Sequence, residues 1–250
     1  SDVNNYYVST GNVTISAKEG DVYNRKNIIS DANVDIEAKT GLTNFAYEIY
    51  ATDNINLTAT EGNLINKTML VSKEGNINLT ADKGTVVNLL GGDVYALGGS
   101  VKMYAGAEAD TERVVRFVDN KTGEVRAQTL SLPTDIPVGA TVIARHNSDN
   151  TTSVIYVDAK NEQHVVQTVE GIVDVFRTGD VINRGDAIAL GKTDAAGNVI
   201  AKGVINLESA NGNIANYDDF GTIDNGNTSY TLNKPSAVEY IGDWLAAEEY

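Results

Sequence analysis

The chain has 250 residues, with 34 acidic and 19 basic side chains, a formal net charge of -15 and no cysteine. The negative charge would repel nucleic-acid phosphates and anionic lipid surfaces, and the lack of thiols excludes disulfides and thiolate metal sites. No apolar run reaches the roughly 18 residues that a membrane-spanning helix needs, so we expect neither nucleic-acid binding nor membrane insertion.

A repeat motif of about 14 residues recurs from the N-terminus onwards. It reads GNVTISAKEGDVYN from Gly11 and GNINLTADKGTVVN from Gly75. Related copies of the motif begin at Asp31, Asp53, Gly171 and Gly203. In the first four copies of the motif, the first asparagines are Asn12, Asn33, Asn54 and Asn76, which are spaced by 21, 21 and 22 residues. A fixed period of this length is typical of a solenoid.

Each copy of the motif predicts two short strands joined at a corner. Apolar Val13, Ile15 and Ala17 alternate with polar neighbours, which is the pattern of a half-buried strand. This strand is followed by a corner that contains glycine, by a second strand and by a further apolar patch such as Ile28-Ile29; the next copy of the motif then begins. Three short strands per period predict an all-β fold, a parallel β-helix whose first coils span residues 1–106. An α-helix is excluded for the repeat motifs, because their glycine and asparagine residues would destabilise every helical turn.

The last residue of each motif is an asparagine, and this recurrence predicts a structural ladder of asparagine side chains. These residues are Asn5, Asn24, Asn44, Asn66, Asn88, Asn183 and Asn216. Equivalent positions of stacked coils lie about 4.8 Å apart, so their amides can hydrogen-bond along the axis and satisfy one another. The alternative is that asparagine is present only because it tolerates a left-handed turn. Both interpretations are structural.

The period is lost between residues 107 and 170. This segment contains RVVRFVDNKTGEVRAQTL and TSVIYVDAKNEQHVVQTV, which predict two hairpins with turns at 119–123 and 158–162, and TVIARH predicts a strand between them. We expect an antiparallel β insertion that is anchored at both ends by coils. It is either a binding region held by a rigid scaffold or a decoration that shields a face and locks the coils.

The coils are expected to resume over 171–235, with a hairpin loop at 191–203. The C-terminal segment 236–250 begins with a capping-box pattern, Ser236 followed by Glu239, and predicts a short helix.

Groups with catalytic potential are sparse. Carbohydrate-active β-helices gather carboxylates beside a basic residue, but only Asp35 and Glu37 are neighbours in the outward columns, as on a solvated face. His146 and His164 fall in the insertion without a metal-binding or catalytic pattern around them. We therefore expect no enzymatic activity, no cofactor and no bound metal.

Because of these repeat motifs, residues 1–106 and 171–216 resemble the filamentous haemagglutinin family, which comprises exoproteins of two-partner secretion systems and related adhesins. The resemblance implies a right-handed parallel β-helical rod that a dedicated outer-membrane transporter exports, so that the parent chain is secreted or held at the bacterial cell surface. It also implies binding to a host-cell or bacterial surface protein or glycan. The NPNG-like motif of the family's secretion domain is absent from the sequence, so rod or binding region is expected.

The expected function is that of a non-enzymatic segment of a large bacterial adhesin. Two alternatives remain open: a carbohydrate-active β-helix of the lyase or hydrolase kind, and the stalk of a contact-dependent toxin or cytolysin. Three or more converging carboxylates beside a lysine or arginine would favour an enzyme. Uniform columns of asparagine and threonine with a protruding hairpin module would favour an adhesin.

Overall fold

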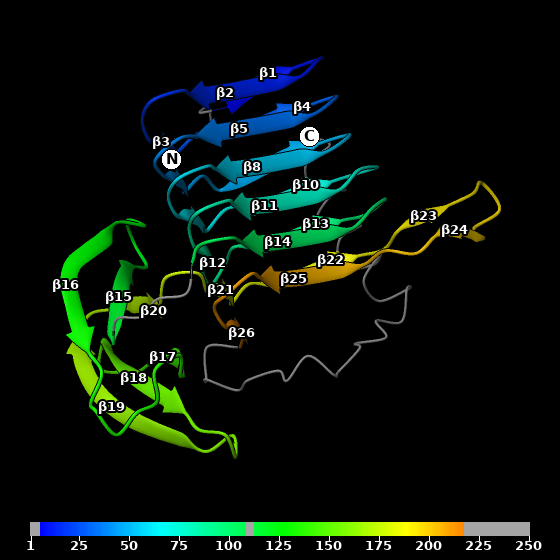
Figure 1. The fold of residues 1–250 in the computed structure, drawn as a ribbon. Coiled ribbons are helices and arrows are strands. Elements are labelled where there is room, and N and C mark those ends of the chain that lie inside the picture. Colours follow the sequence, from blue (N-terminus) through cyan, green and yellow to red (C-terminus); the bar gives the residue numbers. More distant parts are fainter. Residues whose placement is uncertain (1–5, 109–112, 218–250) are drawn as a thin grey trace.

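The computed structural model describes residues 6–108 and 113–217. Within these ranges the chain is all-β and contains no helix, and its parallel sheets stack as a β-solenoid (Figure 1). No helix in the described ranges is long and apolar enough to cross a membrane. The helix expected over 236–250 and the ladder position Asn5 lie outside the described residues.

Each coil contributes one strand to each of three six-stranded parallel sheets. The first sheet contains β1 (Tyr6–Ser9), β4 (Asn27–Ser30), β7 (Glu48–Ala51), β10 (Met69–Ser72), β13 (Val94–Ala96) and β22 (Ala187–Ala189). The second contains β2 (Val13–Ala17), β5 (Val34–Ala38), β8 (Ile55–Ala59), β11 (Ile77–Ala81), β14 (Val101–Ala105) and β25 (Ile205–Ser209). The third contains β3 (Val22–Asn24), β6 (Leu42–Asn44), β9 (Leu64–Asn66), β12 (Val86–Asn88), β21 (Val181–Asn183) and β26 (Ile214–Asn216).

The core consists of columns of like side chains that run along the solenoid axis. The inward-pointing residues of the inner coils are buried, and Val13, Ile15 and Ala17 of the first coil are partly buried against them; neighbouring strands pair these residues in the same order. In β8 and β11 the pairs are Ile55 with Ile77, Leu57 with Leu79 and Ala59 with Ala81. Because every coil repeats the same alternation, each new coil covers the apolar side chains of the previous one.

Glycine is needed at the corner between the second and third sheets, because successive coils approach closely there. A methyl group on Gly62 would lie 1.3 Å from the carbonyl oxygen of Thr40, whereas one on Gly20 in the first coil would meet nothing within 4 Å. We expect Gly62→Ala to lower the free energy of unfolding by about 1–3 kcal/mol, since the backbone must shift to accept the methyl group. The matched variant Gly20→Ala should be nearly neutral. Urea titrations of both variants test the difference, and equal losses would contradict the steric explanation.

Two antiparallel insertions leave the solenoid at different corners (Figure 1). The large one follows β14 and contains β15 (Val114–Asp119), β16 (Val125–Ser131), β17 (Thr141–His146), β18 (Thr151–Val157), β19 (Gln163–Glu170) and β20 (Val173–Phe176). These strands form two three-stranded sheets, in the orders β16-β15-β20 and β17-β18-β19. The small one, between β22 and β25, is a hairpin of β23 (Lys192–Thr193) and β24 (Val199–Ala201). The antiparallel excursion predicted from the sequence is thereby confirmed.

The large insertion extends further along the chain than the predicted boundary at residue 170. The sequence alignment placed residues 171–183 in a coil. The structure instead pairs β20 antiparallel with β15, so that Val175 lies opposite Phe117. The solenoid resumes only with β21, which pairs parallel with β12. The alignment failed here because alternating apolar residues indicate a strand but do not identify the strand with which it pairs.

Candidate functional site

The closing asparagines stand in one column at the corner between the third and first sheets. In each coil the side-chain Nδ2 donates a hydrogen bond to Oδ1 of the next coil's asparagine. The distances are 2.8 Å from Asn24 to Asn44, 2.9 Å from Asn44 to Asn66, 2.8 Å from Asn66 to Asn88, 2.8 Å from Asn88 to Asn183 and 2.7 Å from Asn183 to Asn216. The column continues across the large insertion, although Asn88 and Asn183 are 95 residues apart. The amides are engaged with one another, which gives these residues a structural role.

The large insertion packs against the outer face of the third sheet. Ile65, Val87 and Ile182 point outwards from this sheet and are nevertheless buried, because they belong to one apolar cluster with side chains of the insertion. The insertion contributes Val118, Ile143, Ile155 and Phe176 to this cluster. Sequence reasoning missed this contact, yet a signal was present: the strands LIN, VVN and VIN are apolar on both faces, unlike VYN and LTN in the first two coils.

A buried ion pair joins the insertion to the last coils. The Arg184 guanidinium contacts the Asp174 carboxylate, and both side chains are fully buried. Asn120 Nδ2 donates to Asp174 Oδ2 at 2.6 Å, and His146 Nε2 lies 3.0 Å from Arg184 Nη1. The Arg184 guanidinium also lies 4.8 Å from the ring centroid of Tyr217, whose pKa burial raises to about 12. His146 therefore belongs to the contact that holds the insertion in place.

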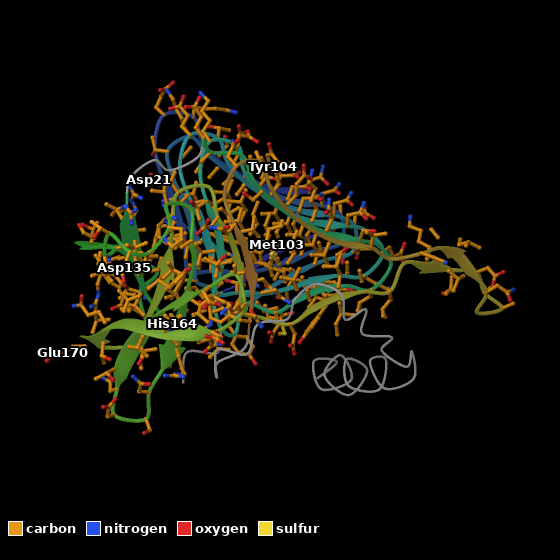
Figure 2. The ribbon with its side chains drawn as sticks, turned by 60° about the horizontal axis from the view of Figure 1, so that its bottom comes forward. Asp21, Met103, Tyr104, Asp135, His164 and Glu170 are labelled. Atoms are coloured by element: carbon orange, nitrogen blue, oxygen red, sulfur yellow. The ribbon has the colours of Figure 1, made fainter. Side chains whose placement is uncertain are left out.

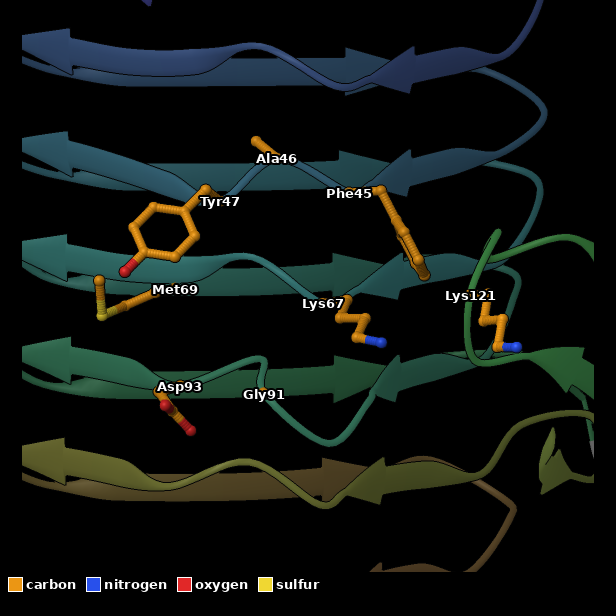
Figure 3. Close-up of a pocket in the computed structure, with 8 residues that line it drawn as sticks. All are labelled: Phe45, Ala46, Tyr47, Lys67, Met69, Gly91, Asp93 and Lys121. Atoms are coloured by element: carbon orange, nitrogen blue, oxygen red, sulfur yellow. The ribbon is translucent and has the colours of Figure 1, made fainter. Parts of the chain in front are cut away.

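A groove of about 420 Å³ opens where the first turn of the insertion meets the corner between the third and first sheets (Figure 3). Its lining residues are Phe45, Ala46, Tyr47, Lys67, Met69, Gly91, Asp93 and Lys121. Figure 3 shows that successive coils supply these residues along the solenoid axis and that Lys121 comes from the insertion. The groove thus depends on both parts of the molecule.

The groove combines an aromatic surface with amino groups. Tyr47 is 68% exposed, and Lys121 is also exposed. Lys67 is held in place, because its Nζ lies 2.6 Å from the carbonyl oxygen and 2.7 Å from Oδ1 of Asn120 and 5.8 Å from the centroid of the Phe45 ring. Burial lowers the pKa of Lys67, an effect opposed by nearby carboxylates. These groups suit a ligand that stacks on a ring and hydrogen-bonds to amines.

The neighbouring carboxylates of the second sheet take part in surface contacts. Asp35 Oδ1 accepts a hydrogen bond from Asn56 Nδ2 at 2.7 Å, and Asn78 Nδ2 donates to Asn56 Oδ1 at 2.8 Å. Glu37 pairs with Lys18 at 3.5 Å. The residues beside Asp35 in its column are Thr14 and Asn56, and those beside Glu37 are Ser16 and Thr58. The two carboxylates therefore lie in columns of polar side chains, as the sequence predicted.

The exposed turn between β18 and β19 gathers Asp158, Glu162 and His164, whose possible ligand atoms all lie within 4.8 Å of one another. His164 Nε2 lies 3.0 Å from Asp158 Oδ2, and the backbone N–H groups of Lys160 and Glu162 donate to Asp158 Oδ1. The hydrogen bond with His164, followed by that from Glu162, lowers the pKa of Asp158. The hydrogen bonds of the turn account for this grouping, which the sequence reasoning missed. Figure 2 shows His164 on the insertion, apart from Met103 inside the solenoid.

The fold and the asparagine column define a parallel β-solenoid repeat protein with an antiparallel insertion docked on one sheet. No family model, curated protein or solved structure matches the chain. The resemblance to filamentous haemagglutinins therefore rests on the repeat motifs alone; all of them except the first half of the motif at 171–183 lie in stacked coils of the solenoid.

Proposed function

We propose that the chain is a non-enzymatic segment of a large bacterial adhesin, either secreted or held at the cell surface. In this proposal the solenoid is a rod that supplies distance, and the large insertion and its adjoining groove make contact with the partner. The partner is a host-cell or bacterial surface protein or glycan, and an outer-membrane transporter exports the parent chain. The carrying observation is the docking of the insertion on the third sheet beside an open groove lined by both.

A fixed insertion favours binding, because little conformational freedom remains to be lost when a ligand is bound. The apolar cluster around Ile65 and Val87 and the buried pair of Asp174 with Arg184 attach the insertion along the sheet as well as at its two ends. Binding groups on such an insertion are held by a rigid scaffold. The Tyr47 ring and the Lys121 amine are then presented at constant separation.

The competing hypothesis of a carbohydrate-active enzyme has less support. A lyase or hydrolase of this kind needs converging carboxylates beside a cation. Asp35 and Glu37 instead bond to Asn56 and Lys18 within polar columns. The columns are only partly uniform: asparagine or threonine occupies both in β8 and β11, whereas β14 contributes Lys102 and Tyr104. The antiparallel module docked on the third sheet is therefore the feature that favours an adhesin.

Tyr47→Ala tests the groove. We expect the variant to bind its partner at least about tenfold more weakly than the unaltered chain, because an exposed ring supplies stacking area in a binding site. Its unfolding midpoint should be unchanged, since the ring is largely exposed. The measurement is binding to an array of glycans and matrix proteins and to intact cells.

Tyr104→Ala is the matched control, because Tyr104 projects outwards from the second sheet, in the column of Glu37 and Thr58. It should bind as the unaltered chain does. Equal weakening by both substitutions would remove the groove from the proposal. Failure of the unaltered chain to bind any array member or cell surface, or its cleavage of a polysaccharide, would contradict the adhesin function itself. Deletion of the insertion is a poor test, because it would uncover the apolar outer face of the third sheet.

A further inference from the structure

The outer face of the first sheet carries an apolar column. Outward positions of neighbouring strands pair in register along this column, whose members are Val8, Ile29, Tyr50, Val71, Tyr95 and Ile188. On the outer face of the second sheet, the column through Glu37, Thr58 and Thr80 is polar. The first sheet therefore presents outwards the kind of side chains that a sheet buries beneath a further layer.

Two members of this column are buried although they point outwards. Val71 is 0% exposed and Tyr95 is 4% exposed. Thr80 belongs to the same coil as Val71 and points outwards from the second sheet, yet it is only half-buried. Val87 points outwards from the third sheet and is fully buried, because the large insertion covers that face. Burial of an outward apolar side chain in the inner coils thus indicates a covered face.

The described apolar neighbours of these two side chains all come from the coils of the first sheet itself. Within residues 6–108 and 113–217, the apolar side chains that pack on Val71 and Tyr95 are Tyr50, Met69, Leu97 and Ile188. Three of them lie in strands of the first sheet, and the fourth directly follows β13. A covering layer therefore has to come from the residues outside the described ranges.

We propose that the segment 236–250 docks on the outer face of the first sheet, over Val71 and Tyr95, and that 218–235 connects it to the last coil. In the preceding coils, the corner after the closing asparagine leads to the first sheet, and the chain reaches this corner again after Asn216. Tyr95 lies two coil spacings from the position that would follow β26, a distance of about 10 Å. The connection is several times longer than this when it is extended.

The other segments outside the described ranges are poorly placed to form this layer. Residues 109–112 follow β14 of the second sheet and precede β15 of the insertion, which docks on the third sheet. Residues 1–5 precede β1, which is four coil spacings from Tyr95. These spacings amount to about 19 Å, whereas five fully extended residues span at most about 18 Å.

The sequence of 236–250 has the two-sided pattern that a covering layer needs. In the helix predicted for this segment, Val238, Ile241 and Leu245 lie on one side. Glu239 and Asp243, four residues apart, lie on the other side. Docking therefore brings the apolar side onto the apolar column and leaves these two carboxylates towards water.

Tryptophan fluorescence of the full chain tests the proposal, because Trp244 is the only tryptophan. We expect blue-shifted emission from the unaltered chain and quenching by acrylamide at least about fivefold weaker than that of free tryptophan, since a docked ring loses contact with water. Val71→Lys places a charge in the contact and should abolish both features. Thr80→Lys, the matched control on the second sheet of the same coil, should leave both unchanged.

A second pair of variants changes the segment and leaves every residue of the coils as it is. Ile241→Lys should make Trp244 as accessible to acrylamide as Val71→Lys does. Glu239→Lys, on the opposite side of the predicted helix, should not. Far-UV circular dichroism and urea titration of all four variants check that the coils remain folded.

Two results would overturn the proposal. One is a Trp244 in the unaltered chain that is quenched as efficiently as free tryptophan. The other is a shielded Trp244 that responds no more to Val71→Lys than to Thr80→Lys, because the segment would then pack elsewhere, for example within a further coil. If Val71→Lys unfolds the coils, Ile241→Lys decides, and unchanged quenching in that variant would overturn the proposal.

Discussion

Replacing Asn66 with alanine should lower the free energy of unfolding by about 3–5 kcal/mol. Asn66 is fully buried; its Oδ1 accepts from Asn44 Nδ2 at 2.9 Å, and its Nδ2 donates to Asn88 Oδ1 at 2.8 Å. Nδ2 also reaches the carbonyl oxygen of Thr68 at 3.0 Å. Alanine would leave several of these groups unsatisfied, and each buried polar group without a partner costs about 1–3 kcal/mol. Equilibrium unfolding in urea or guanidinium chloride measures the loss.

Asn78→Ala is the control for this prediction. The Asn78 amide also donates to an asparagine of the preceding coil, at 2.8 Å to Asn56 Oδ1, but it lies half-buried on the outer face of the second sheet. Water can replace that bond, so we expect a loss below about 1 kcal/mol. If Asn66→Ala and Asn78→Ala were equally harmful, burial of the inner column would not explain its contribution to stability.

Arg184→Met should lower the free energy of unfolding by a similar amount, about 3–5 kcal/mol, because it leaves the buried Asp174 carboxylate without its cation. Methionine retains the apolar stem, so the loss reports the missing charge more than missing volume. We further expect the insertion to loosen first, since Arg184 follows β21 in the solenoid and Asp174 lies in β20 of the insertion. Denaturant titration measures the loss, and hydrogen exchange of the insertion's amides locates it.

Two further variants separate the charge effect from other causes. Adding Asp174→Asn to Arg184→Met removes the uncompensated charge but keeps an acceptor for Asn120, and it should restore at least half of the lost stability. Arg126→Met breaks the partly exposed pair with Asp119, which water can reach, and should cost at most about 1 kcal/mol. A loss in Arg184→Met no larger than in Arg126→Met would show that the buried pair does not hold the insertion to the coils.

The solenoid accommodates its large insertion because the chain leaves and re-enters at positions that a single coil would connect. β14 pairs in register with β11, and β21 pairs in register with β12, as though no insertion lay between them. The asparagine column therefore passes directly from Asn88 to Asn183. A long excursion at a corner costs little extra closure entropy, since that cost rises only slowly with loop length.

The sequence by itself determined the coils and the stacked asparagines. Val13, Ile15 and Ala17 alternate with polar residues, and the same alternation returns after 21 or 22 residues, so hydrophobic burial requires like side chains to stack in columns. Hairpin turns such as 119–123 were also predicted, because turn chemistry is local. These features follow from neighbours along the chain or from a fixed period.

Only the tertiary structure decided where the insertion lies and what it creates. The alternation in β20 was equally compatible with a coil, and its antiparallel partner β15 lies more than 50 residues away in the chain. The groove beside Tyr47 and the pairing of Asp174 with Arg184 likewise arise where the insertion meets the solenoid. Such contacts depend on which apolar face of the insertion meets the third sheet, and no periodic signal in the sequence specifies that choice.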